Sequence, residues 1–388
     1  MGSGRTCGRR QEARRGAPSW SATNAGGAVT KMGGDILIAT DRAAARVTLN
    51  RPQALNALTT PMRTAMASAF PRWARDPEIY AVIIASASAR AFCAGGDLRE
   101  MTEWGRNRRP EAVKSLAEEY ALNWLLECFT KPTISLIDGV VMGSGVGISL
   151  YGTHRVAGEG YRFAMPETGI GLFPDDGVSW AFARMPDAIG VYLALTGRSI
   201  GRADAYHLGL ATHCISSDRF GEICAGLADA DVVDTLLDDR HEDPGAGELE
   251  PLRPAIARCF APDTVEGILD ALKAERGLAQ SWAQGILKDL SRCSPTSLKI
   301  AHRHVRMAGE LDLRDTLIGD FRLARRCLEG HDLYEGVRAA LIDRDRAPKW
   351  QPPRLQEVND ALVDAYFSPL GADELALPTR ARMQAFAS

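Results

Sequence analysis

Residues 133–150 read TISLIDGVVMGSGVGISL, a strand-like run followed by a glycine-rich helix start. Residues 133–138 have the composition and length of a buried β-strand. From Gly143 onward, small and apolar residues predict an apolar helix. A buried strand that leads through a short turn into a helix is typical of an α/β core.

The same alternation of strands and helices extends along the chain in both directions. Short apolar or β-branched runs predict strands over 35–40, 45–50, 80–86 and 154–157. Helical spacing of apolar residues predicts helices over 61–73 and 111–129. Beyond about residue 185 the pattern becomes helical, with helices expected near 263–273, 276–290, 295–307 and 311–328.

The chain divides into three parts on composition. Residues 1–31 hold five arginines against one acidic residue and contain no apolar segment, which excludes a secretory signal. They read either as a mitochondrial transit peptide or as an unstructured extension. Residues 238–250 (DDRHEDPGAGELE) lack apolar periodicity and predict a loop. We therefore expect a disordered or cleaved leader over 1–32, a core over 33–237 and a helical C-terminal region over 238–388.

Overall composition excludes several classes of protein. Of the 388 residues, 45% are hydrophobic and 24% charged, as in soluble globular proteins. A net charge of −3 argues against a nucleic-acid-binding surface. No run of 18 apolar residues exists, so no membrane-spanning helix is expected. The eight cysteines lack the spacing of a zinc site or a disulfide framework, so we expect no metal.

Two glycine-rich turns follow predicted strands and could present backbone donors to a ligand. They are AFCAGGDL (91–98) and GVVMGSGVG (139–147). The first N–H groups of a helix have no partner inside it, so two such turns could form an oxyanion hole. Turns of this kind also serve packing alone. The spacing matches neither a dinucleotide fingerprint nor the G-x-S-x-G elbow, which argues against Ser144 as a nucleophile.

A third stretch, FAMPETGIGLFPDDG (163–177), places Glu167 and Asp175 among apolar residues. Carboxyl groups in such surroundings have raised pKa values and can act as a general acid or base near neutral pH. The alternative is that these are solvated loop carboxylates. Asp176, directly beside Asp175, strengthens that alternative for at least one of the two.

Four segments together resemble the crotonase (enoyl-CoA hydratase/isomerase) superfamily in order and spacing: NRPQALNAL (50–58), AFCAGGDLREM (91–101), GVVMGSGVGISL (139–150) and residues 163–177. The phrase AMPETGIGLFPD and two distal segments, SPTSLKIA (294–301) and residues 322–350, resemble its 3-hydroxyisobutyryl-CoA hydrolase family. The resemblance covers roughly residues 33–368. It implies a crotonase-type α/β spiral of ββα units, with a helical C-terminal region that completes the active site.

The resemblance also implies roles for individual residues. The backbone N–H groups of Gly96 and Ser144 would hold the thioester oxygen of an acyl-CoA. Glu167 would attack the carbonyl carbon or activate water, and Asp175 would orient the substrate hydroxyl or assist proton transfer. Hydratases of the superfamily carry a catalytic carboxylate where this chain has Gly147. The resemblance therefore implies thioester hydrolysis rather than hydration.

Further contacts with the substrate are implied at Asp97, Leu98 and Arg99, which follow Gly96, and at Glu119. Arg99 could reach a CoA phosphate. Glu119 lies away from the apolar stripe of its predicted helix, so a solvated position is the alternative. The basic run 106–109 reads either as a screen for the CoA phosphates or as a solvated loop.

The remaining expectations concern partners and location. The partner is a small acyl-CoA substrate, with no nucleic acid, no membrane and no cofactor beyond the CoA of the substrate, and a homo-oligomer is expected. The location is cytoplasmic, or the mitochondrial matrix if residues 1–31 are a transit peptide. The alternatives for function are a hydratase or isomerase of the same fold and a non-catalytic acyl-CoA-binding protein.

Overall fold

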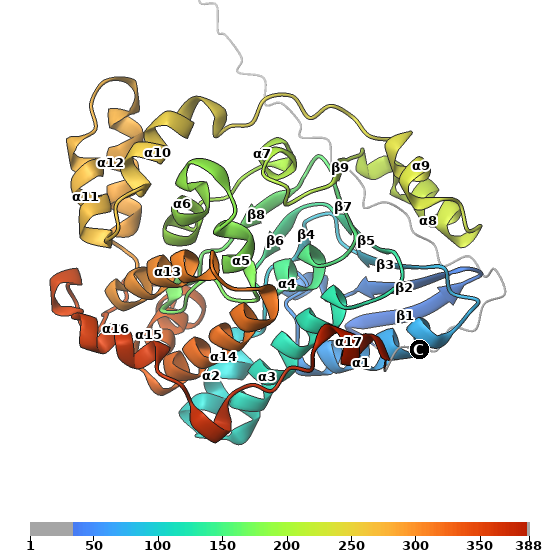
Figure 1. Ribbon diagram of the computed structural model, residues 1–388, viewed down its shortest axis with the longest axis horizontal. Helices are drawn as coiled ribbons and strands as arrows, with labels where there is room; N and C mark the ends of the chain where they lie inside the picture. The colour runs from blue at the N-terminus through green and yellow to red at the C-terminus, as the bar shows by residue number, and fades with distance from the viewer. Residues whose placement is uncertain (1–33, 386–388) are drawn as a thin grey trace, which may run out of the picture.

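The computed structural model describes residues 34–385 and contains two β-sheets (Figure 1). The larger sheet has six strands in spatial order β1, β2, β3, β5, β7, β9. The first pair is antiparallel and the later pairs are parallel. Its strands are β1 (Ile36–Asp41), β2 (Ala44–Leu49), β3 (Ala81–Ser86), β5 (Thr133–Ile137), β7 (His154–Ala157) and β9 (His213–Cys214).

The smaller sheet consists of three parallel strands of three residues each, in spatial order β4, β6, β8. They are β4 (Ala91–Cys93), β6 (Val140–Met142) and β8 (Arg162–Ala164). Each one directly follows a strand of the larger sheet, so the chain visits both sheets before it enters the next helix. This repeat is the predicted spiral of ββα units, which the structure confirms.

Three helical segments complete the turns of the spiral. The first turn ends in α2 (Leu98–Arg106) and α3 (Pro110–Glu127), and the second ends in α4 (Ser144–Leu150). The third passes through a 3₁₀ turn (Glu167–Ile170) into α5 (Val178–Phe182). The earlier helix α1 (Thr60–Arg75) packs against α3.

Side chains alternate between the two faces of the larger sheet, because successive residues of a strand point in opposite directions. On β3, Val82 and Ile84 join the main core, whereas Ile83 joins a second cluster. That cluster is covered by α8 (Phe220–Ala228) and α9 (Val233–Asp238). The sheet is therefore buried on both faces, which explains its continuous apolar strands.

The last third of the chain is helical and packs back onto the spiral (Figure 1). Helix α14 packs on α3 and α13 packs on α6, and one hydrophobic cluster runs through both regions. These helices are α6 (Ile189–Thr196), α7 (Arg202–His207), α10 (Arg253–Phe260), α11 (Val265–Ala274), α12 (Gln280–Leu290), α13 (Pro295–Ala308), α14 (Leu313–Glu329), α15 (Asp332–Val337), a π-helical turn (Arg338–Ile342), α16 (Asp360–Phe367) and α17 (Arg380–Ala385).

Residues 239–249, between α9 and a 3₁₀ turn at Glu250–Leu252, form neither helix nor strand. This segment connects α9 to α10 across the top of the view in Figure 1. The expected leader over 1–32 lies outside the described residues. Within residues 34–385, no helix combines the length and the apolar character needed to cross a membrane.

Candidate active site

The three short strands of the smaller sheet each lead to one predicted functional residue. Gly96 follows β4, Ser144 follows β6 as the first residue of α4, and Glu167 follows β8. Because the strands are parallel, their carboxyl ends meet at one edge of the sheet, where ligands bind in α/β folds. A cavity of about 600 Å³ opens there. All eight predicted site residues line it: Gly96, Asp97, Leu98, Arg99, Glu119, Ser144, Glu167 and Asp175.

The two predicted oxyanion donors lie in turns that approach each other closely. A Cβ added at Gly96 would lie 3.0 Å from Ser144 Oγ, and one at Gly95 would lie 3.9 Å from the Ser144 nitrogen. Gly95 and Gly143 have positive φ values of 109° and 47°, which glycine adopts at little cost. Among residues 34–385, no group accepts a hydrogen bond from the backbone N–H of Gly96 or Ser144. Both donors are therefore available to a ligand.

Glu167 lies beside these donors and is almost fully buried, with 6% of its surface exposed. A Cβ added at Gly143 would lie 3.2 Å from Glu167 Oε1. The other carboxyl oxygen, Oε2, is buried without a hydrogen-bond partner in the described part of the chain. Burial raises the pKa of Glu167 well above its ordinary value, and the charge of Asp175 raises it further. An under-coordinated carboxylate of this kind is a strong base and nucleophile.

Asp175 is buried as well and is held in place by α3. Its Oδ2 accepts a hydrogen bond of 2.7 Å from the hydroxyl of Tyr120. Burial raises the pKa of Asp175, and the neighbouring Glu119 and Asp320 add to the rise, while the hydrogen bond from Tyr120 opposes it. Asp175 can thus hold a proton at a higher pH than an exposed aspartate.

Glu119 is not on a solvated face of its helix, so that alternative is wrong. It is 8% exposed, and its Oε2 lies 3.7 Å from Nη1 of Arg63 on α1. Helices α1, α2 and α14 all pack against α3, which leaves little of α3 open to water. The second oxygen, Oε1, is buried and has no hydrogen-bond partner within residues 34–385. It is an acceptor without a donor at the wall of the cavity.

Asp175 and Asp176 are both buried, so the expectation that at least one is a solvated loop carboxylate is also wrong. Asp176 Oδ1 accepts a hydrogen bond of 2.7 Å from Asn123, and its carbonyl oxygen accepts one from the Tyr151 hydroxyl. A Cβ added at Gly147 would lie 2.8 Å from Asp176 Oδ1 and 2.9 Å from the Asn123 amide. The place where hydratases carry a second carboxylate is therefore filled by this pair.

A buried pair from the C-terminal region anchors the loop that carries Asp175, and sequence reasoning missed it. Asp320 of α14 accepts a hydrogen bond of 2.6 Å from the backbone N–H of Gly177. Its other oxygen lies 2.5 Å from Nε2 of His304 on α13. Local sequence holds no signal for this contact, because 143 positions separate Gly177 from Asp320.

Arginines from distant segments line the same cavity. Arg51 forms an ion pair of 2.9 Å with Asp97, and Arg99 donates a hydrogen bond of 2.7 Å to the carbonyl of Leu341. Leu341 and Arg344 are contributed by the C-terminal region. The predicted basic run 106–109 does not line this cavity. Three of its arginines line a separate hollow beside Tyr334.

Among residues 34–385, no group of three or more histidine, cysteine, aspartate or glutamate side chains is arranged to hold a metal ion. What the cavity offers instead is two free amide donors, two buried carboxylates with an unpartnered oxygen, and guanidinium groups. Such a set can polarise a carbonyl group and supply a base or nucleophile to its carbon.

Comparison with known proteins agrees with this geometry. Residues 44–367 match the family model described as enoyl-CoA hydratase/isomerase. The chain is 39% identical over 358 residues to the mitochondrial 3-hydroxyisobutyryl-CoA hydrolase of Xenopus tropicalis, covering 90% of this chain and 92% of that one. The enzyme of the same name from Homo sapiens is 38% identical over 339 residues, covering 85% and 87%.

Solved structures show the same fold. A carnitinyl-CoA dehydratase from Mycobacterium thermoresistibile superimposes with a TM-score of 0.84 at 37% identity, covering 89% of this chain and 99% of that one. An enoyl-CoA hydratase from Rhodobacter sphaeroides 2.4.1 gives 0.82 at 35% identity, covering 89% and 100%. The resemblance seen in the sequence is confirmed, and the chain belongs to the enoyl-CoA hydratase/isomerase family of the crotonase superfamily.

Proposed function

We propose that this protein is a thioester hydrolase that converts 3-hydroxyisobutyryl-CoA to 3-hydroxyisobutyrate and CoA, a step of valine catabolism. The observation that carries the proposal is the position of Glu167, which is buried with an unpartnered oxygen beside two free backbone donors. The substrate is supported by the names of relatives that match about nine-tenths of the chain.

The reaction begins with binding of the thioester oxygen between the N–H groups of Gly96 and Ser144. These donors stabilise the negative charge that develops on this oxygen. In one route Glu167 attacks the carbonyl carbon, the C–S bond breaks, and water then hydrolyses the mixed anhydride. In the other route Glu167 takes a proton from water, which attacks directly. In both routes the departing CoA sulfur takes a proton, for which Asp175 is suitably placed.

The substrate hydroxyl provides the selectivity. Oε1 of Glu119 is a buried acceptor without a donor among residues 34–385, and Asp175 lines the same cavity. A buried acceptor left unpaired by a substrate without a hydroxyl costs binding energy. We therefore assign recognition of the 3-hydroxyl group to Glu119 and Asp175.

Hydration of an enoyl-CoA is the rival activity, and it is named in the titles of two similar structures. The filled space at Gly147 argues against it, because hydratases use two carboxylates to position water. A non-catalytic acyl-CoA-binding protein would have no use for the unpartnered carboxylate of Glu167.

The substrate is a small CoA thioester, as for other members of the family. The homo-oligomer and the absence of nucleic-acid, membrane and cofactor partners stay predictions. The curated relatives are named mitochondrial, which favours the matrix over the predicted cytoplasmic location. Fusion of residues 1–31 to a fluorescent protein tests this, because a transit peptide would deliver the fusion to mitochondria.

The proposed activity is tested by thiol release from matched esters. We expect faster release of CoA from 3-hydroxyisobutyryl-CoA than from isobutyryl-CoA or acetyl-CoA, because the latter two leave the acceptors of Glu119 and Asp175 unpaired. A thiol-reactive dye measures the free CoA. Equal rates on all three esters, or no release from any, would contradict the assignment.

Glu167→Gln should lower kcat by about 10²–10⁴-fold while the variant still binds the ester, because an amide neither attacks nor takes a proton. Steady-state kinetics and calorimetric binding of a CoA ester measure the two effects. Glu111→Gln, an exposed change on the same chain, is the matched control. A Glu167→Gln variant that keeps more than about a tenth of the wild-type turnover would rule out this role.

The pH dependence follows from the raised pKa of Glu167. Since the ionised form is the active one, kcat/KM should fall as the pH drops through this raised pKa. Asp175→Asn removes a negative charge that raises the pKa of Glu167, so its acidic limb should move to lower pH even though its maximal rate falls. A pH–rate profile of both proteins checks the shift, and an unmoved limb would contradict it.

Ser144→Ala should stay active and Ser144→Pro should not. Alanine keeps the backbone donor, whereas proline deletes it and removes roughly 10²–10³-fold in kcat. Ser144 is the first residue of α4, a position where proline is well tolerated in helices. Circular dichroism must show that both variants fold. A folded but inactive Ser144→Ala variant would restore a serine nucleophile.

Gly147→Glu should not create a hydratase. The new side chain would meet Asp176 and Asn123, and overpacking of this kind costs about 1–3 kcal/mol. We expect a lower melting temperature and no hydration of crotonyl-CoA, followed by absorbance. Gly169→Ala is the matched control, because a Cβ there meets nothing within 4 Å. Efficient hydration by the glutamate variant would reopen the rival activity.

A further inference from the structure

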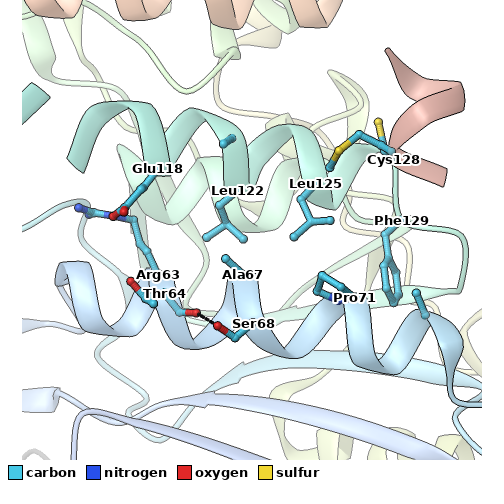
Figure 2. A pocket seen from close by; sticks show the side chains of 13 residues that line it. Arg63, Thr64, Ala67, Ser68, Pro71, Glu118, Leu122, Leu125, Cys128 and Phe129 are labelled. Carbon is cyan, nitrogen blue, oxygen red and sulfur yellow. Dashed lines mark hydrogen bonds between the residues drawn. The ribbon is translucent and has the colours of Figure 1, made fainter. Parts of the chain in front are cut away.

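A second hollow lies between α1 and α3, directly behind the proposed acyl-CoA cavity (Figure 2). It has a volume of about 430 Å³, within the range of small-molecule sites. Most of its lining is apolar and includes Ala67, Pro71, Leu122, Leu125 and Phe129. The lining residues of α1 run from Arg63 to Ala74, which at 1.5 Å per residue spans roughly 16 Å.

Arg63 stands where this groove meets the acyl-CoA cavity. It is the one residue that lines both hollows in the described part of the chain. Along α3, Ser115 and Glu119 face the cavity, and the next turn, with Glu118 and Leu122, faces the groove. Figure 2 shows Arg63 at the end of the groove beside Glu118. The two hollows therefore follow one another along the same pair of helices.

The side chain of Arg63 is fixed between the two helices and is 5% exposed. Its guanidinium donates to the carbonyl of Leu58 at 3.3 Å, to Thr60 Oγ1 at 3.2 Å and to Ser115 Oγ on α3. It also lies 3.7 Å from Glu119 Oε2. A charged group held this way does not accommodate methylene groups, because moving it or covering it would break these contacts.

We propose that Arg63 is a specificity-determining residue that closes the acyl end of the cavity and keeps the bound acyl group short. The groove behind it is acyl-binding space that the wild-type protein does not use. This inference rests on the proposed binding of acyl-CoA in the cavity, but not on hydrolysis of the thioester. Removal of the guanidinium would join the two hollows and admit a medium-length, unbranched acyl chain.

The wild-type protein provides the first test. Calorimetric affinities for butyryl-, hexanoyl-, octanoyl- and decanoyl-CoA should stay flat, because no further methylene group is buried. An open path would instead give roughly a tenfold gain for every two methylenes buried. Such a rise in the wild-type protein would overturn the proposal without any need for a variant.

The second test opens the path. We expect Arg63→Leu combined with Glu119→Gln, which avoids leaving an unpaired buried carboxylate, to bind decanoyl-CoA at least tenfold more tightly than Glu119→Gln alone. Arg63→Lys, which keeps a cation, should retain the wild-type profile. Adding Ala121→Phe, which fills the groove, should abolish the gain. A folded double variant whose affinity does not rise, or a gain that survives Ala121→Phe, would refute the role of Arg63.

These measurements separate the two proposals. Binding of acyl-CoA is read without turnover, so a wild-type protein that binds the esters but releases no CoA would remove the hydrolase activity and leave the partition testable. Conversely, thiol release from 3-hydroxyisobutyryl-CoA together with an affinity that rises with chain length would keep the activity and reject the partition.

Discussion

The parallel pairing of three very short strands is the constraint on which the site depends. β4, β6 and β8 contribute only three residues each, yet their register brings their carboxyl ends to the same edge. Gly96, Ser144 and Glu167 are distant in the sequence and follow these three ends directly. The larger sheet, buried on both faces, holds the preceding strands in order and so fixes where the short ones begin.

A second constraint is the concentration of acidic groups in a low-dielectric interior. Glu119, Glu167, Asp175, Asp176 and Asp320 are all buried around the cavity and the loop behind it. Asp176 and Asp320 are satisfied by hydrogen bonds from groups of the protein. Unpaired oxygens remain on Glu119 and Glu167, and both line the cavity. Burying unpaired acceptors is costly, so substrate binding supplies the partners that folding leaves out.

Much of this arrangement follows from the sequence. The strands of the larger sheet that have four or more residues, and the long helices, carry enough apolar periodicity to be predicted within a few residues. The glycine turns and the segment 163–177 mark the site. The strands of the smaller sheet are too short for a period-two pattern, and thus the second sheet was not predicted from periodicity. Its existence followed only from the family resemblance.

Other features lie beyond local pattern altogether. Glu119 breaks the apolar stripe of α3, but amphipathic reasoning fails for a helix packed on several sides. The bond between Asp320 and Gly177 and the entry of Leu341 and Arg344 into the cavity join segments far apart in the chain. Such contacts are set by tertiary packing, which a single sequence does not display.

The bond from Gly177 to Asp320 has a consequence for the synthesis of the protein. At about 5–20 residues per second, the ribosome needs roughly 7–30 s to add the 143 residues between them. During that interval the loop with Asp175 is already made, but the helices α13 and α14 that fix it are not. The nascent chain can assemble its sheets early, yet the loop acquires its anchor only near the end of translation. A prematurely terminated chain therefore lacks an ordered catalytic loop, so incomplete copies do not consume acyl-CoA.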